Sequence, residues 1–166
     1  MMNIYEFAMQ MEKDGEKYYR ELMAASKVDG LKKIFAMLAE EEVKHYQLIK
    51  QLQLNKGEVQ FEETRILTNV KNIFIGMKEE KPDLHIDTTV ETDAFRKARD
   101  IEKQSMDFYL EKAEKAENES EKKLLKRLAK EEEKHLHIMQ NLVAFVSRPE
   151  PGNWLENAEW HHLEEY

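Results

Sequence analysis

An eight-residue motif occurs twice in this chain, ninety positions apart. Residues 38–45 read LAEEEVKH and residues 128–135 read LAKEEEKH, so each copy contains the pattern Glu-x-x-His. Residues three apart on a helix project from the same face. A carboxylate and an imidazole that converge from one face are common metal ligands. The duplicated motif therefore predicts two similar helices and two metal ions.

The same offset relates residues that precede the motif. In each half a Glu is followed seven residues later by a Tyr, and the two pairs are Glu12 with Tyr19 and Glu102 with Tyr109. Apolar and small residues recur every three to four positions in four segments, which predicts four helices. These segments are residues 2–26, 31–54, 92–117 and 120–147.

Short turns separate the segments within each half, so each half is predicted to be an antiparallel helix hairpin. Val28-Asp29-Gly30 and Asn118-Glu119-Ser120 are the expected turns. The connection over residues 55–90 is too long for a structureless loop in a compact domain, and its apolar spacing from Ile66 to Met77 predicts a short amphipathic helix.

The predicted fold is all-α: a four-helix bundle over residues 1–147, made of two helix hairpins joined by a long crossover. We expect the tail, residues 148–166, to pack on the bundle or on a partner subunit. Its His161 and His162 stand among acidic residues, but a packing segment with Trp154 and Trp160 is favoured over an exposed metal site.

Six polar residues stand on the inward-facing rows of the four helices. They are Glu12, Glu42, His45, Glu102, Glu132 and His135. Four buried carboxylates without counter-charges would cost several kcal/mol each. No Lys or Arg shares their rows, whereas two divalent cations would balance the four charges. Carboxylate oxygen with neutral imidazole suits iron or manganese.

These residues, in this order along four helices, resemble the rubrerythrin-type ferritin-like di-iron carboxylate proteins over residues 2–147. The resemblance implies a ferritin-like bundle with two Fe ions, for which Mn or Zn could substitute. It implies bridging roles for Glu42 and Glu132, terminal roles for Glu12 and Glu102, and one His per iron. It also implies that Tyr19 and Tyr109 donate hydrogen bonds to the opposing carboxylates.

Two features depart from that family. The chain has no cysteine, so it lacks the four-cysteine iron domain of rubrerythrins proper, and electrons must come from an external donor. Ser105 occupies the position, three residues after Glu102, where many members carry a further Glu. This second departure counts against efficient peroxidase chemistry.

The expected function is therefore reduction of peroxide or O₂ with electrons from the external donor. An iron-binding or sequestration protein without turnover is the alternative, and a metal-free interaction module is a third hypothesis. Whether the chain is an enzyme stays open at this point. A homodimer is the default that the family implies.

Composition excludes some partners. The net charge of −8 argues against a nucleic-acid surface, and no apolar run is long enough to span a membrane. The first residues lack the basic flank and the unbroken apolar run of a signal peptide. We therefore expect a cytoplasmic protein, with which the absence of cysteine is compatible.

Three acidic residues near the motif are harder to assign. Glu16 lies one turn beyond Glu12, but its equivalent in the second half is Met106, so Glu12 is the better ligand candidate. Glu41 and Glu131 are duplicated, and each precedes its His by four residues. They are either solvated or in contact with the metal ligands.

Overall fold

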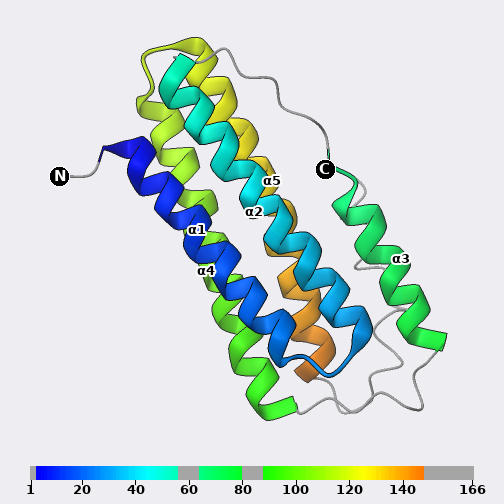
Figure 1. The fold of residues 1–166 in the computed structure, drawn as a ribbon. Helices are drawn as coiled ribbons and strands as arrows, with labels where there is room; N and C mark the ends of the chain where they lie inside the picture. Colours follow the sequence, from blue (N-terminus) through cyan, green and yellow to red (C-terminus); the bar gives the residue numbers. More distant parts are fainter. Residues whose placement is uncertain (1–2, 56–63, 80–87, 148–166) are drawn as a thin grey trace.

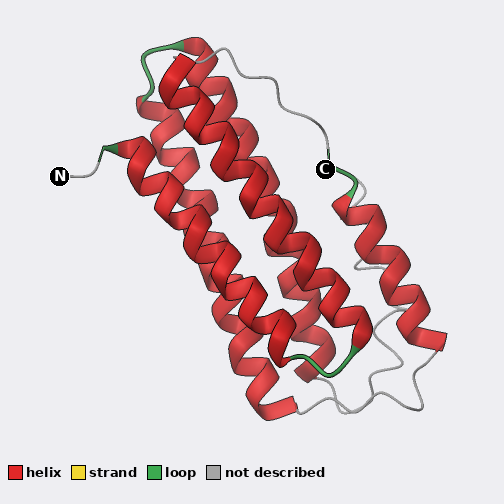
Figure 2. Cartoon of the chain, viewed as in Figure 1, coloured by secondary structure: helices red, strands yellow, loops and turns green. Residues whose placement is uncertain are grey.

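The computed structural model describes residues 3–55, 64–79 and 88–147. Within these residues every regular element is a helix (Figure 2), which confirms the predicted all-α class. The helices are α1 (Ile4–Ala25), α2 (Asp29–Asn55), α3 (Ile66–Glu79), α4 (Thr88–Lys115) and α5 (Glu119–Ser147). None of these helices is both long and apolar enough to cross a membrane.

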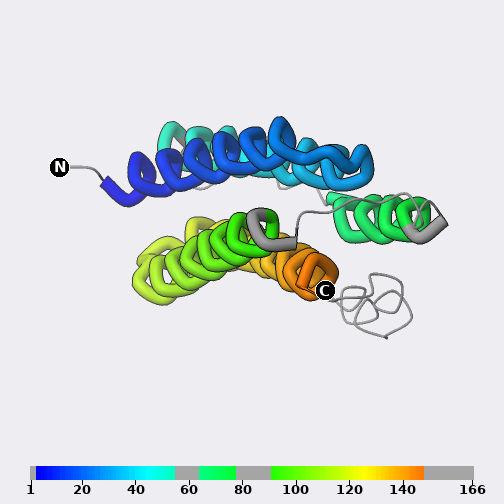
Figure 3. The backbone as a smooth tube through the Cα atoms, turned by 90° about the horizontal axis from the view of Figure 1, so that it is seen from below, coloured from blue at the N-terminus to red at the C-terminus, as the bar shows by residue number. Residues whose placement is uncertain are grey.

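Two antiparallel hairpins form the bundle. The most extensive packing lies between α1 and α2 and between α4 and α5. In the view from below, the α1–α2 hairpin forms one layer and the α4–α5 hairpin the other (Figure 3). The end of α2 and the start of α4 lie at opposite ends of the bundle (Figure 1). The two predicted hairpins joined by a long crossover are therefore confirmed.

The crossover contains the short helix that its apolar spacing predicted. Helix α3 lies beside α2 and also contacts α5 (Figure 1). It buries four apolar side chains, one or two per turn, against the larger hydrophobic cluster of the bundle. These are Ile66, Val70, Phe74 and Met77. The predicted packing of the tail, residues 148–166, lies outside the described residues.

Two hydrophobic clusters fill the bundle, and the duplicated motifs lie between them. Along α2, the buried apolar residues between 31 and 39 belong to the larger cluster, and Ile49 and Leu52 belong to the smaller one. Along α5, the buried apolar residues between 124 and 129 belong to the smaller cluster, and those between 138 and 146 belong to the larger one. The polar residues of both motifs therefore occupy one layer with apolar packing above and below it.

Helices α2 and α5 both begin within the segments that were predicted to be turns. Helix α2 begins at Asp29, so Asp29 and Gly30 are helical, and the connection is only residues 26–28. Helix α5 begins at Glu119, so Glu119 and Ser120 are likewise helical rather than part of a turn. The Asn118 side chain accepts hydrogen bonds from the backbone N–H groups of Ser120 and Glu121, which satisfies donors of the first helical turn.

Gly30 is required by packing and not by a turn. A Cβ atom added to it would lie 2.4 Å from Sδ and 2.5 Å from Cγ of Met77 on α3. Both distances are far shorter than van der Waals contact. Helix α3 therefore approaches the first turn of α2 closely at this point, and glycine makes that approach possible.

We expect Gly30→Ala to destabilise the protein by about 1–3 kcal/mol, because the added methyl group overpacks this contact. Gly76→Ala is the matched control, since Gly76 is also helical and has nothing within 4 Å of an added Cβ. The control should be neutral or stabilising by up to about 1 kcal/mol, owing to the better helix propensity of alanine. Chemical denaturation measures both. Equal effects of the two substitutions would contradict the close contact between α2 and α3.

Candidate metal centre

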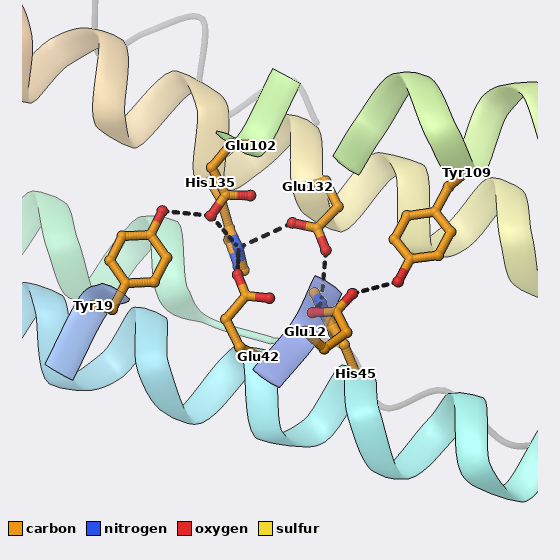
Figure 4. Close-up of polar contacts among 8 residues, drawn as sticks. All are labelled: Glu12, Tyr19, Glu42, His45, Glu102, Tyr109, Glu132 and His135. Carbon is orange, nitrogen blue, oxygen red and sulfur yellow. Dashed lines mark hydrogen bonds and ion pairs between the residues drawn. The ribbon is translucent and has the colours of Figure 1, made fainter. Parts of the chain in front are cut away.

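All four bundle helices contribute to one polar cluster in the interior (Figure 4). Each of the eight residues is at most 3% exposed. The residues are Glu12 and Tyr19 from α1, Glu42 and His45 from α2, Glu102 and Tyr109 from α4, and Glu132 and His135 from α5. The structure thus brings together all eight residues that the sequence singled out.

The six carboxylate and imidazole side chains form two overlapping groups. In each group, one potential ligand atom per residue lies within 4.8 Å of those of the other members. One group is Glu12, Glu42, His45 and Glu132, and the other is Glu42, Glu102, Glu132 and His135. Glu42 and Glu132 belong to both groups, which is the arrangement that bridging carboxylates between two ions require.

The two imidazoles present their Nδ1 atoms to the carboxylates. Nδ1 of His45 lies 3.1 Å from Oε1 of Glu132 and 3.5 Å from Oε2 of Glu12. Nδ1 of His135 lies 3.2 Å from Oε1 of Glu42 and 3.5 Å from Oε1 of Glu102. The rings are nearly parallel, with centroids 5.4 Å apart. Each imidazole therefore contacts a carboxylate from the opposite hairpin.

The tyrosines connect the two hairpins. The Tyr19 hydroxyl on α1 donates a hydrogen bond to Glu102 on α4, and the Tyr109 hydroxyl on α4 donates one to Glu12 on α1 (Figure 4). Burial and the adjacent carboxylates raise the pKa of both phenols well above 10. Both tyrosines therefore remain protonated donors, which orient the two carboxylates that receive their hydrogen bonds.

The carboxylates divide into two classes by protonation. Burial raises the pKa of Glu42 and of Glu132 well above the usual value, and neighbouring carboxylates raise both further. For Glu12, burial alone would also raise the pKa. The hydrogen bond from Glu42 and the charge of His45 outweigh it and lower the pKa to about 2. Glu102 behaves likewise, because the charge of His135 lowers its pKa against the effect of burial.

The imidazoles are held in the charged form. Burial alone would lower the pKa of His45, but the charges of Glu12 and Glu132 raise it to about 10. Glu102 has the same effect on His135, whose pKa lies well above 6.5 despite burial. Without metal, these pKa directions favour imidazoliums at His45 and His135, ionised carboxylates at Glu12 and Glu102, and protons on Glu42 and Glu132. In that protonation state the centre is neutral.

The donor atoms fit a pair of divalent cations. Oε2 of Glu12 and Oε2 of Glu132 are buried and have no hydrogen-bond partner among the described residues. Two divalent ions that displaced the four protons would again leave the centre neutral, with four carboxylates and two neutral imidazoles. Such ions would also satisfy the buried oxygens, and they would bind more tightly as the pH rises.

A buried glycine in α1 borders the cluster and was not recognised as part of it from the sequence. A Cβ atom added to Gly15 would lie 3.3 Å from Cδ and 3.3 Å from Oε2 of Glu42. The absence of a side chain therefore lets the Glu42 carboxylate lie against the α1 backbone. The available signal was a glycine one turn after Glu12, on the same inward-facing row as Tyr19 and Leu22.

Glu41 and Glu131 are both buried, with exposed fractions of 6% and 0%. Of the two alternatives that the sequence left open, this burial favours contact with the interior over a solvated position. Glu131 forms an ion pair with Lys134, in which Nζ lies 2.9 Å from Oε1. Glu41 forms a third group of potential ligands with His45 and His135.

We expect the metal-free protein to lose stability as the pH rises from about 6.5 to about 10. The pKa of His45 is 6.5 in the unfolded chain and about 10 in the fold. Stabilisation by the charged ring is therefore complete below pH 6.5 and is lost as the pH rises through 10. The loss approaches about 1.4 kcal/mol per pH unit for each such group. The raised pKa of Glu42 acts in the same direction, beginning above pH 4.5.

Chemical denaturation of chelator-treated protein across this pH range measures the effect. The His45→Gln variant is the control, and its stability should depend less steeply on pH. An unfolding free energy that stayed constant between pH 6.5 and 10 would contradict the buried imidazoliums.

Comparison with known proteins assigns the family. A family model described as Rubrerythrin matches residues 3–143, which is most of the chain. The comparisons with curated proteins and with solved structures returned no match. The family implies a ferritin-like helical bundle and di-iron binding, and the structure provides carboxylate and imidazole groups that could hold the ions. From its family match and its helical bundle, this chain belongs to the rubrerythrin family.

Proposed function

We propose that this protein is a non-haem di-iron oxidoreductase that reduces hydrogen peroxide or O₂ with electrons from an external donor. The observation that supports it best is the pair of overlapping four-residue groups that share Glu42 and Glu132. We propose Glu12, Glu42, His45, Glu102, Glu132 and His135 as the metal ligands. Mn or Zn could occupy the same donor set.

Two ferrous ions would supply one electron each, which together with two protons reduce the O–O bond of hydrogen peroxide to two water molecules. The protein itself would exclude bulk water from the centre and hold the carboxylates in place. The apolar clusters on both sides of the polar layer exclude bulk water. This exclusion strengthens every electrostatic interaction within the centre.

Tyr19 and Tyr109 keep the proposed terminal carboxylates in place. Each hydroxyl donates its hydrogen bond to a Glu of the opposite hairpin. In Glu12, Oε1 accepts the hydrogen bond and Oε2 faces His45. In Glu102, Oε1 both accepts the hydrogen bond and lies 3.5 Å from Nδ1 of His135. Because the pKa of both phenols is raised, the tyrosines hold their protons at the hydroxyl oxygen while the charge of the centre changes.

Electrons have to reach the centre from outside this sequence. The chain has no cysteine, so it provides neither a thiolate-bound iron centre nor a dithiol. At the half-exposed position three residues after Glu102 it has Ser105, which supplies no further carboxylate. We therefore propose a separate reductant protein and a donor set limited to four Glu and two His.

Anaerobic addition of Fe(II) to metal-free protein should load two irons per chain. Glu42→Ala and His135→Ala should each lose at least one iron. Glu42 belongs to both groups of potential ligands, and His135 belongs to one of them. Glu16→Ala is the matched control. It removes a carboxylate one turn from Glu12 that is paired with Arg20 at the surface. Elemental analysis after gel filtration gives the stoichiometry. Two irons retained in both ligand variants would refute the proposed ligands.

Turnover separates catalysis from iron sequestration. With excess peroxide and a low-potential reductant, we expect each loaded chain to consume many equivalents of peroxide. Tyr19→Phe should keep its iron but turn over more slowly, since Glu102 loses its hydrogen-bond donor. Peroxide consumption that stopped after one equivalent per di-iron centre would instead favour the sequestration hypothesis.

A further inference from the structure

The duplicated acidic residues beside the ligands differ in their surroundings. Glu131 is fully buried and is neutralised by two cations. Nζ of Lys134 lies 2.9 Å and Nε of Arg127 lies 3.5 Å from its Oε1 atom. In the first half, Lys44 is the equivalent of Lys134 and is exposed, and Met37 is the equivalent of Arg127 and is partly buried. The sequence repeat therefore keeps the lysine but places it at the surface, and it is broken at Arg127.

Glu41 has no such partner. It forms no hydrogen bond or ion pair with any residue that the structure describes, although it is only 6% exposed. One of its carboxylate oxygens lies within 4.8 Å of ring nitrogens of His45 and His135. Among the described residues, none of the groups of potential ligand atoms includes Glu131. Of the two duplicated carboxylates, Glu41 alone is thus both unpaired and close to the imidazoles.

His135 has a ring nitrogen that needs an acceptor. Its Nδ1 atom faces Glu42 and Glu102 in the centre. Its Nε2 atom is buried and has no hydrogen-bond partner among the described residues, in a side chain that is 0% exposed. When Nδ1 binds a metal ion, Nε2 carries the proton. A buried N–H without an acceptor is costly, and metal-bound imidazoles usually donate this proton to a carboxylate or carbonyl.

We propose that Glu41 is a positioning residue for the metal centre, whose carboxylate accepts the hydrogen bond of the His135 Nε2–H directly or through one water. This bond crosses from α2 to α5 and fixes the ring that faces Glu42, Glu102 and Glu132. Glu131 does not have the equivalent role, because Lys134 and Arg127 engage its carboxylate. The two metal positions are therefore inequivalent although their direct ligands are symmetric. The inference rests on the proposed metal centre.

Co²⁺ titrated into metal-free protein tests the inference through its visible absorption. In Glu41→Gln, we expect one of the two ions to bind about 10–100-fold more weakly, since a neutral amide is a poorer acceptor than a carboxylate. Glu41→Asp should recover part of the affinity. Glu131→Gln, the equivalent change in the other half, should leave both Co²⁺ affinities unchanged and lower the thermal stability of the metal-free protein.

A second measurement does not depend on affinity. In Zn²⁺-loaded protein labelled with ¹⁵N-histidine, the His135 Nε2–H should exchange slowly with water. Exchange should be faster in Glu41→Leu and unchanged in Glu131→Gln. Equal affinity losses in Glu41→Gln and Glu131→Gln, or an unchanged exchange rate in Glu41→Leu, would overturn the inference about Glu41 but not the proposed metal centre. Wild-type protein that bound fewer than two Co²⁺ ions would overturn the proposed metal centre together with it.

Discussion

Four carboxylates buried in the middle of a helical bundle are the constraint on which this structure depends. An ionised carboxylate in an apolar interior is unstable unless it is paired or hydrogen-bonded. The fold meets this demand in the metal-free state by placing two imidazoliums against Glu12 and Glu102 and by leaving protons on Glu42 and Glu132. Protonation, packing and the proposed metal binding are thus coupled.

The apolar parts of the bundle are arranged around that layer. The larger cluster includes Tyr19, Phe35 and Phe95, with the rings of Phe35 and Phe95 edge to face at 5.2 Å. The smaller cluster includes Tyr109 on the other side. Each tyrosine therefore belongs to a hydrophobic cluster through its ring and to the polar centre through its hydroxyl. Because the packed ring fixes the position of the hydroxyl, the hydrogen bond from that hydroxyl fixes the position of the carboxylate.

The sequence predicted the parts of this structure that follow from helical periodicity and from the repeat. The helix-period spacing gave four long helices and the short helix from Ile66, and the ninety-residue offset selected Glu12 over Glu16. These residues could be predicted from their spacing alone, because the face of a helix on which a residue lies depends only on nearby positions in the sequence. All eight residues at the centre were named in this way, although their role as metal ligands stays a prediction.

Features that arise from contacts between distant segments could not be predicted in this way. Gly30 was interpreted as a turn residue, but its role depends on Met77 of α3, which no local pattern relates to it. Gly15 matters only because Glu42 approaches it from another helix. The environment of Glu131 stayed open between two alternatives, because its ion pairs with Lys134 and Arg127 depend on how these side chains fold over the buried carboxylate.

The repeat also has a consequence for how such a centre could have originated. Each hairpin contains one Glu with its Tyr and one Glu-x-x-His motif, and every tyrosine hydrogen bond crosses to the other hairpin. A single hairpin thus holds half of the donor set and could complete it by pairing with an identical copy. Gene duplication and fusion of such a homodimer would produce this chain. Afterwards each half could change independently, as Arg127 opposite Met37 illustrates.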